Sequence, residues 1–175
     1  MKEILLDEEG IKQYYEELDK LKLLSLSNAS AGSQSYNDAV GDGWHDNFAF
    51  EETMRESRKI ASRINRMIEE EKYLKIVRKN NYSYDIIDVG DVLTIEVMYD
   101  IDDVEIYTIK LTGKYLPNSE SEIKEISLNS SIGRSIYLKN IHDNNIYYSV
   151  NEKKIKIKIL EKILTSWMTK YLQFI

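Results

Sequence analysis

The chain has 175 residues, 42% of them hydrophobic, so it can bury the core of one ordinary domain, or of a small domain beside an extended element. Its formal net charge of -6 makes the chain as a whole a poor electrostatic match for nucleic acid, which favours a protein partner and confines any nucleic-acid contact to a local basic cluster. The sequence contains no cysteine, which excludes disulfides, thiolate nucleophiles and cysteine-ligated zinc.

The beginning of the chain, MKEILLDEEG, is too acidic and too poor in apolar residues for a signal peptide. No apolar run approaches the length of a membrane span. We therefore expect a cytoplasmic protein without a membrane partner.

A first helix is predicted from Glu8 to Leu26. Its apolar residues recur at spacings of three and four, as on one stripe of a helix: Ile11, Tyr14, Leu18 and Leu21. Residues 25–40 are rich in Ser, Asn and Gly and poor in helix formers, so we expect the distal part of this helix to be frayed or broken.

A second helix is predicted from about Asn47 to Arg78, where helical spacing returns without an internal Gly or Pro: Ile60, Ile64, Met67, Ile68 and Leu74. Neither helix can bury a full core alone. Together they predict an antiparallel coiled-coil hairpin over residues 1–80, with an acidic tip near residues 41–47.

The periodicity changes from helical to alternating after a predicted linker at residues 79–85. A β-hairpin is predicted at 93–97 and 104–111, and further strands at 146–150 and 154–160, where isoleucines alternate with lysines. Residues 161–175 predict an amphipathic terminal helix. The predicted fold class is α+β, with a small β-rich domain over residues 81–175.

The segment GDGWHDNFAFEE, residues 41–52, places two Gly, a Trp, a His and two Asp in six consecutive positions. Asp42 and Asp46 supply two carboxylates, and Mg²⁺ is often held by one or two carboxylates together with phosphate and water. Two ordinary roles stay open beside this one. Asp46 could cap the second helix, and Asp42 could be a turn residue between Gly41 and Gly43.

Two further residues of this segment indicate a contact surface. A large aromatic such as Trp44 is seldom left at a hairpin tip without a surface to meet. His45, together with Asp42 and Asp46, could chelate a transition metal, but three ligands on a loop make a polar contact or a structural role the preferred interpretation.

Five stretches of the chain carry a resemblance to one family. They are GIKQYYEELDKLK (10–22), GDGWHDNFAFEE (41–52), VGDVLTIEV (89–97), YTIKLTG (107–113) and ISLNSSIGRSIYLKN (126–140). In order and spacing they resemble the bacterial Gre transcript-cleavage factors, GreA and GreB, across nearly the whole chain. The family tip usually reads Gly-Asp, two residues, then Glu-Asn-Ala-Glu-Tyr, and the family's FKBP-like domain carries Ser-Pro-(Ile/Leu)-Gly.

The chain departs from this family pattern at both places. With Asn47 matched to the tip Asn, Asp46 stands where the family has its catalytic Glu, and Asp42 stands for the tip Asp with one extra residue between them. In the second half, Ser131 stands where the signature has Pro, and Leu138 where a Gly is usual.

The resemblance implies a transcription elongation factor that enters the secondary channel of RNA polymerase and stimulates cleavage of backtracked RNA. Asp42 and Asp46 would help hold the second, weakly bound Mg²⁺ of the polymerase, with Trp44, His45 and Asn47 as tip contacts. The chain would be an accessory factor and not an enzyme, with no cofactor of its own. Alternatives are a secondary-channel regulator or inhibitor without cleavage stimulation, and a protein-binding module unconnected with transcription.

A basic cluster follows the tip, and Arg55, Lys59, Arg63 and Arg66 recur at helical spacing, so they can share one face. The resemblance implies that this face contacts the 3′ end of the nascent RNA, since phosphate attracts it. The alternative is a solvated face paired with Glu51, Glu52 and Glu56. We expect no independent DNA binding.

Overall fold

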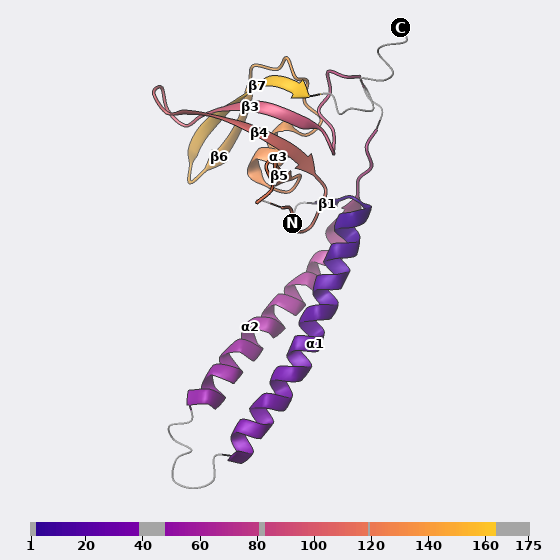
Figure 1. The fold of residues 1–175 in the computed structure, drawn as a ribbon, viewed down its shortest axis with the longest axis vertical. Coiled ribbons are helices and arrows are strands. Elements are labelled where there is room, and N and C mark those ends of the chain that lie inside the picture. The colour runs from indigo at the N-terminus through magenta and orange to yellow at the C-terminus, as the bar shows by residue number, and fades with distance from the viewer. Residues whose placement is uncertain (1–2, 39–47, 81–82, 119, 164–175) are drawn as a thin grey trace. The chain divides into compact units, whose positions relative to one another are not determined.

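The computed structural model describes residues 3–38, 48–80, 83–118 and 120–163. Its residues divide into two compact units, one formed by Lys12–Leu74 and the other by Ile4–Ile11 together with the chain from Lys75 onwards. The predicted α+β class is confirmed, with a helical N-terminal region and a curled β-sheet (Figure 1). The second unit takes in Ile4–Ile11, which the sequence-based division at residue 80 assigns to the hairpin.

The first helix, α1, runs from Glu8 to Asp38. Asp7 caps it, because its Oδ1 accepts the backbone N–H of Gly10 at 2.7 Å, and Glu8 and Glu9 follow in the first turn. The helix continues through Gly32, so the expectation of a break within residues 25–38 is wrong. Helix propensity is a weak preference, and the surroundings of a segment routinely override it.

The second helix, α2, runs from Phe48 to Glu70 and is shorter than predicted. A single 3₁₀ turn, Glu71–Tyr73, follows it, and then the short strand β2, Leu74–Ile76. The chain leaves the helix because β2 pairs with β1, Ile4–Leu6, and the N–H of Val77 donates to the carbonyl of Leu6 at 2.8 Å.

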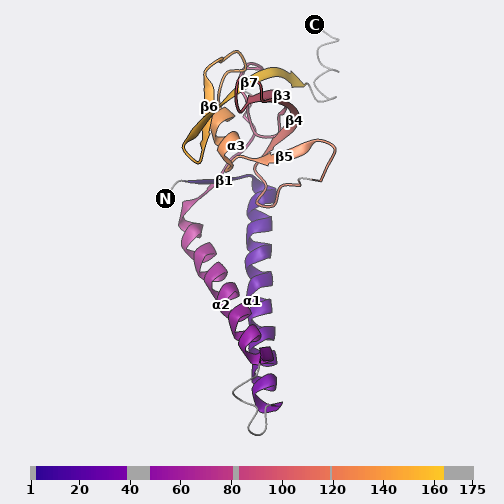
Figure 2. The ribbon, with the colours of Figure 1, turned by 90° about the vertical axis from the view of Figure 1, so that its left-hand side faces the viewer.

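The two helices lie side by side and are antiparallel (Figure 1 and Figure 2). The hydroxyl of Tyr14 near the start of α1 donates to the carbonyl of Met67 near the end of α2, and Glu17 pairs with Arg63 at 2.7 Å. Buried or half-buried positions recur in both helices at spacings of three and four residues, which is the periodicity of two helices packed along one face. They are Tyr14, Leu18, Leu21, Ser25 and Asn28 in α1, and Phe50, Thr53, Ser57, Ile60, Ile64 and Met67 in α2.

The second unit is built on a five-stranded sheet in the order β5-β4-β3-β7-β6. Its strands are β3 (Val92–Met98), β4 (Val104–Thr112), β5 (Lys124–Ser127), β6 (Ile146–Val150) and β7 (Lys153–Ile163). The β4–β5 pair is parallel and the other pairs are antiparallel. All four predicted strands are confirmed.

Strand β7 confirms the predicted alternation, since Ile155, Ile157 and Ile159 enter the core while Lys154 and Lys158 are exposed. The strand continues to Ile163, so the predicted terminal helix is wrong for residues 161–163. These three residues pair with β3 beyond a register shift next to Thr94. The rest of the predicted helix, 164–175, lies outside the described residues.

The short helix α3, Ser131–Ile136, contains the stretch that resembles the family signature. The hydroxyl of Ser130 accepts the N–H of Gly133 at 3.0 Å and so caps the helix. A side chain at Gly133 would collide with the carbonyl of Ser127, which explains the glycine. Ser131 occupies the first helical position, where proline is well tolerated. Leu138 stands where a Gly is usual in the resemblance, and its φ of 59° lies in the left-handed region that favours glycine.

We expect Ser131→Pro to raise the free energy of unfolding by about 0.5 to 1 kcal/mol, because the proline ring fits the first helical turn and restricts the unfolded chain. Ser135→Pro, inside the same helix, should lower it by about 3 kcal/mol. Urea unfolding followed by circular dichroism measures both changes. A loss of more than 1 kcal/mol in Ser131→Pro would contradict this assignment of the helix start.

Candidate functional site

All five predicted tip residues, Asp42, Trp44, His45, Asp46 and Asn47, lie outside the described residues. Helix α2 begins at Phe48, so Asn47 and not Asp46 directly precedes it in the sequence.

The predicted basic face is present on α2, where Arg55, Lys59, Arg63 and Arg66 are all exposed. Two of the four are engaged by carboxylates. Arg55 pairs with Glu52 at 3.0 Å within the helix, and Arg63 reaches Glu17 on α1 at 2.7 Å. Lys59 and Arg66 have no carboxylate partner among the residues that the structure describes.

Arg63 is the member of this face that acts between the two helices. Its partner Glu17 exposes only 13% of its side chain, whereas Arg63 exposes 43%. A second hydrogen-bonded pair, from Tyr15 Oη to Glu71 Oε1 at 2.8 Å, lies closer to the end of α2 and raises the pKa of the Tyr15 hydroxyl, because its proton is held by the carboxylate. The sequence could not indicate either pair, since each joins residues more than 40 positions apart.

The seam between the helices is apolar at one end and polar at the other. Tyr14, Leu18 and Leu21 are buried in α1, whereas Ser25 and Asn28 occupy the next seam positions. Beside this polar part lies a hollow of about 390 Å³, lined by Leu24, Asn28, Glu56, Lys59 and Ile60. The α1 seam positions in this part of the helix pair are polar, so the apolar end supplies most of the burial that holds the helices together.

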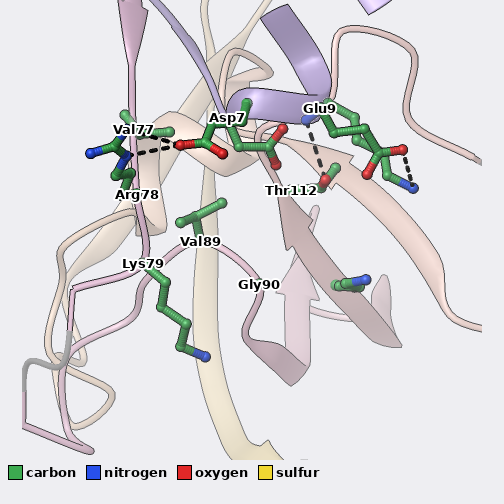
Figure 3. Close-up of a pocket in the computed structure, with 11 residues that line it drawn as sticks. Asp7, Glu9, Val77, Arg78, Lys79, Val89, Gly90 and Thr112 are labelled. Atoms are coloured by element: carbon green, nitrogen blue, oxygen red, sulfur yellow. Dashed lines mark hydrogen bonds and ion pairs between the residues drawn. The ribbon is translucent and has the colours of Figure 1, made fainter. Parts of the chain in front are cut away.

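A second hollow, of about 450 Å³, lies in the sheet-containing unit (Figure 3). Charged side chains of both signs line it around Val77, Val89, Gly90 and Thr112. The basic ones are Arg78, Lys79, Lys110 and Lys114, and the acidic ones Asp7, Glu8 and Glu9. The segments that bring them together are the start of α1, the chain after β2, the turn before β3 and the end of β4. Sequence periodicity gave no signal for this grouping, because the segments are far apart in the chain.

Each of the four cations in this hollow already has a carboxylate partner. Arg78 pairs with Glu8 at 2.9 Å and Lys79 with Asp91 at 2.8 Å. Lys114 pairs with Glu125 at 3.0 Å and Glu9 at 3.6 Å, and Lys110 approaches Glu125 at 3.9 Å. An anion would have to displace these carboxylates, so the hollow is a network of ion pairs and not an open anion site.

The Lys114–Glu125 pair is a largely enclosed interaction of this network. Burial alone would raise the pKa of the Glu125 carboxyl, but the N–H of Asn118 and the ammonium of Lys114 together hold that pKa below its usual value. The hydrogen bond to Glu125 raises the pKa of Lys114. Both shifts favour the charged forms, so the pair stabilises the folded chain at neutral pH.

A buried ion pair at the end of the sheet joins β7 to the turn before β3. The almost fully buried carboxylate of Asp91 forms an ion pair with Lys162, whose Nζ atom lies 2.7 Å from its Oδ2. The same ammonium also donates a hydrogen bond to the carbonyl of Ile86 at 2.7 Å. Asp88, equally buried, accepts the N–H groups of Val89 and Asn80. Gly90, with a φ of 86°, lets the chain turn between the two carboxylates. These carboxylates are committed to the fold.

Among the residues that the structure describes, no group of three His, Cys, Asp or Glu residues could hold a metal ion. No helix there combines the length and apolarity needed to cross a membrane.

No protein-family model matches the chain, and no curated protein matches it. Among solved structures it is similar to GreA factor homolog 1 (Gfh1) of Thermus thermophilus, at 15% identity over 93% of this chain and 100% of that chain, with a TM-score of 0.40. Gfh1 of Thermus aquaticus is 14% identical over 93% of this chain and 99% of that chain, with a TM-score of 0.40.

A third similar structure is the prokaryotic transcription elongation factor GreA/GreB from Nitrosomonas europaea. It is 10% identical over 94% of this chain and 100% of that chain, with a TM-score of 0.34.

We expect Glu125→Gln to lower the free energy of unfolding at pH 7 by about 2 kcal/mol, because the ammonium of Lys114 loses its charged partner. The carboxylate contributes above its unfolded pKa near 4.5, and the contribution is lost as the pH falls through its lower folded pKa. The difference between the two proteins should therefore shrink below about pH 4. Urea unfolding from pH 3 to 8, with the exposed Glu122→Gln as a control, measures it. A difference that does not change with pH would contradict a charge effect.

We expect Lys162→Met to lower the free energy of unfolding by about 3 kcal/mol, because it removes one of the two cations that pair with the buried Asp91 carboxylate. The matched control is Lys158→Met on the same strand, where the lysine is exposed and the change should stay within about 0.5 kcal/mol. Thermal and urea unfolding compare the two variants. Equal effects would show that the Asp91–Lys162 pair does not stabilise the sheet.

Proposed function

We propose that this chain is a transcription elongation factor that binds RNA polymerase through the secondary channel and stimulates cleavage of backtracked RNA. The observation that carries the proposal is the order of three features in one chain. Two antiparallel helices flank the segment GDGWHDN, α2 presents a basic face, and a β-rich unit with the capped SSIGRS helix follows. In this proposal the helices form the coiled-coil hairpin and the sheet is the FKBP-like domain.

The carboxylates of Asp42 and Asp46 are proposed to act at the active centre of the polymerase, and Trp44, His45 and Asn47 to contact its surroundings. Mg²⁺ held there would stabilise the attacking and leaving oxygens of a phosphodiester. Two aspartates suit such a hard ion, which prefers oxygen ligands. Hydrolysis then belongs to the polymerase, so the chain is an accessory factor with no cofactor of its own. A cytoplasmic location follows from this role.

The four residues of the basic face of α2 divide between two tasks in this proposal. Lys59 and Arg66 are exposed and have no carboxylate partner among the described residues, so they are the candidates to meet phosphates of the nascent RNA. Arg63 is engaged with Glu17 on α1 and supports the pairing of the helices, while Arg55 is paired with Glu52.

A second candidate function is a regulator that occupies the secondary channel without stimulating cleavage. The residues that favour it are Asp42 and Asp46 themselves. Their spacing is one residue longer than in the family tip, and aspartate is one methylene shorter than glutamate. A site that must bring two carboxylates to one metal is sensitive to such changes, because a misplacement of about 1 Å can reduce a rate on the order of a hundredfold.

Transcript cleavage in a stalled, backtracked elongation complex, built with the polymerase of the same organism, tests the proposal. Added protein should shorten the RNA from its 3′ end in a Mg²⁺-dependent reaction. The double variant Asp42→Ala, Asp46→Ala should reduce this rate at least about tenfold while still binding the polymerase, because the two carboxylates act in the reaction and not in docking.

The matched control is the double variant Asp19→Ala, Glu69→Ala, which removes the same charge from exposed positions of α1 and α2. It should cleave at the unaltered rate. Polymerase binding with slower nucleotide addition and no shortening would replace the leading proposal by the regulator. Failure to bind the polymerase would remove both.

A further inference from the structure

Strand β6 is the outermost strand of the sheet on the β7 side and lies along its rim (Figure 1 and Figure 2). It reads IYYSV and, among the described strands, pairs with β7 alone, to which it is joined by the two-residue turn Asn151–Glu152. Both turn residues have positive φ, 48° and 68°, as a tight hairpin turn of type I′ requires. The turn fixes the register in which Val150 faces Lys153.

The register determines which backbone groups of β6 point away from β7. In a two-residue hairpin the pair next to the turn, Val150 and Lys153, exchanges hydrogen bonds, and pairs alternate from there. Tyr148 and Ile146 therefore bond to β7, whereas the N–H and C=O groups of Tyr147 and Ser149 point outward. Among the described residues, none of these outward groups has a hydrogen-bond partner.

This edge lacks the features that usually protect an edge strand. Such strands are commonly blunted by a charged side chain, a proline or a bulge. The five residues of β6 include neither a charge nor a proline, and their pairing with β7 shows no register shift. Tyr147, Ser149 and Val150 are exposed, so within the part of the chain that the structure describes the edge is open to another extended chain along most of its length.

Positive charge lies beside the open edge on one face of the sheet. Tyr147 and Ser149 face the same side as Lys154 and Lys156, with which they pair across the two strands. The Nζ atom of Lys154 lies 4.1 Å from the centre of the Tyr147 ring, so its ammonium leans from β7 over β6 toward the rim. On the other face, Ile146 and Tyr148 are buried in the core.

We propose that the edge of β6 binds an extended acidic segment of a protein partner, which adds a sixth strand to the sheet. Its backbone pairs with the outward groups of Tyr147 and Ser149. Acidic side chains at alternate positions face Lys154 and Lys156, and apolar side chains between them extend the layer of Ile146 and Tyr148. This recognition combines backbone hydrogen bonds for affinity with alternate side chains for specificity.

Charge favours such a partner over a second copy of this chain. Two β6 strands that pair antiparallel about a twofold axis would present the same face of both sheets on one side. Lys154 and Lys156 of each copy would then lie on that side together, and their positive charges would repel each other across the two β6 strands. An acidic strand turns the same lysines into attractive partners. The inference stands independently of the polymerase proposal.

Fluorescence anisotropy with a labelled octapeptide in which glutamate alternates with valine tests this inference. We expect saturable binding by the full chain and changes in the amide resonances of Tyr147 and Ser149. Ser149→Pro removes an outward N–H while leaving the bonds to β7 intact, so binding should weaken at least tenfold. Ser149→Thr keeps the N–H and should bind as the unaltered chain does.

Charge variants keep the test decisive if Ser149→Pro does not fold, which circular dichroism would reveal. Lys154→Glu and Lys156→Glu should each weaken binding about threefold or more, whereas Lys139→Glu, an exposed lysine outside β6 and β7, should have no effect. Three results would overturn the inference: no binding of the acidic peptide at 1 mM, equal binding of a lysine–valine peptide, or self-association of the chain that Ser149→Pro abolishes.

Discussion

The pairing of α1 with α2 depends on a short apolar seam, and the arrangement of the first unit follows from it. Tyr14, Leu18, Leu21 and Met67 are buried, and the Tyr14 hydroxyl satisfies the carbonyl of Met67 inside this seam. Helices of this kind gain most of their stability from packing of one face and little from propensity. Because the next positions of α1 are Ser25 and Asn28, the free energy of pairing comes mainly from one end of the helix pair.

The chain is acidic overall, yet two exposed basic surfaces among its described residues have a defined structural setting. On α2, Arg55 and Arg63 are held by Glu52 and Glu17, which leaves Lys59 and Arg66 for an outside partner. On β7, the lysines alternate with core isoleucines, so they are fixed on one face of a strand. In contrast, the cations of the charged hollow and the buried Lys162 are all paired, and their role is to stabilise the fold. Pairing, more than the mere presence of basic residues, therefore separates candidate contact surfaces from structural ones.

Segments with a sustained period could be predicted from the sequence, and short or context-dependent ones could not. The alternation in β3 and β7 and the three-four spacing in both helices were sufficient to predict these elements. Strands β1 and β2 have three residues each, too few to show a period, and they exist because they pair with each other. The helical state of residues 27–38 also escaped prediction, because local composition alone opposed it. Of the candidate site, the exposed face of α2 was predictable from spacing, whereas the link from Arg63 to Glu17 needed the antiparallel register of two helices.

The proposed role depends on delivery of the segment between the helices to the active centre of the polymerase. The most direct measurement replaces Trp44 by a photoreactive phenylalanine analogue and irradiates the protein bound to a backtracked elongation complex with RNA labelled at its 3′ end. The proposal predicts a cross-link from position 44 to the RNA 3′ end or to the polymerase active centre, and none from the same analogue at the exposed position Leu23. A polymerase-bound protein whose position 44 cross-links to neither would contradict the proposed role.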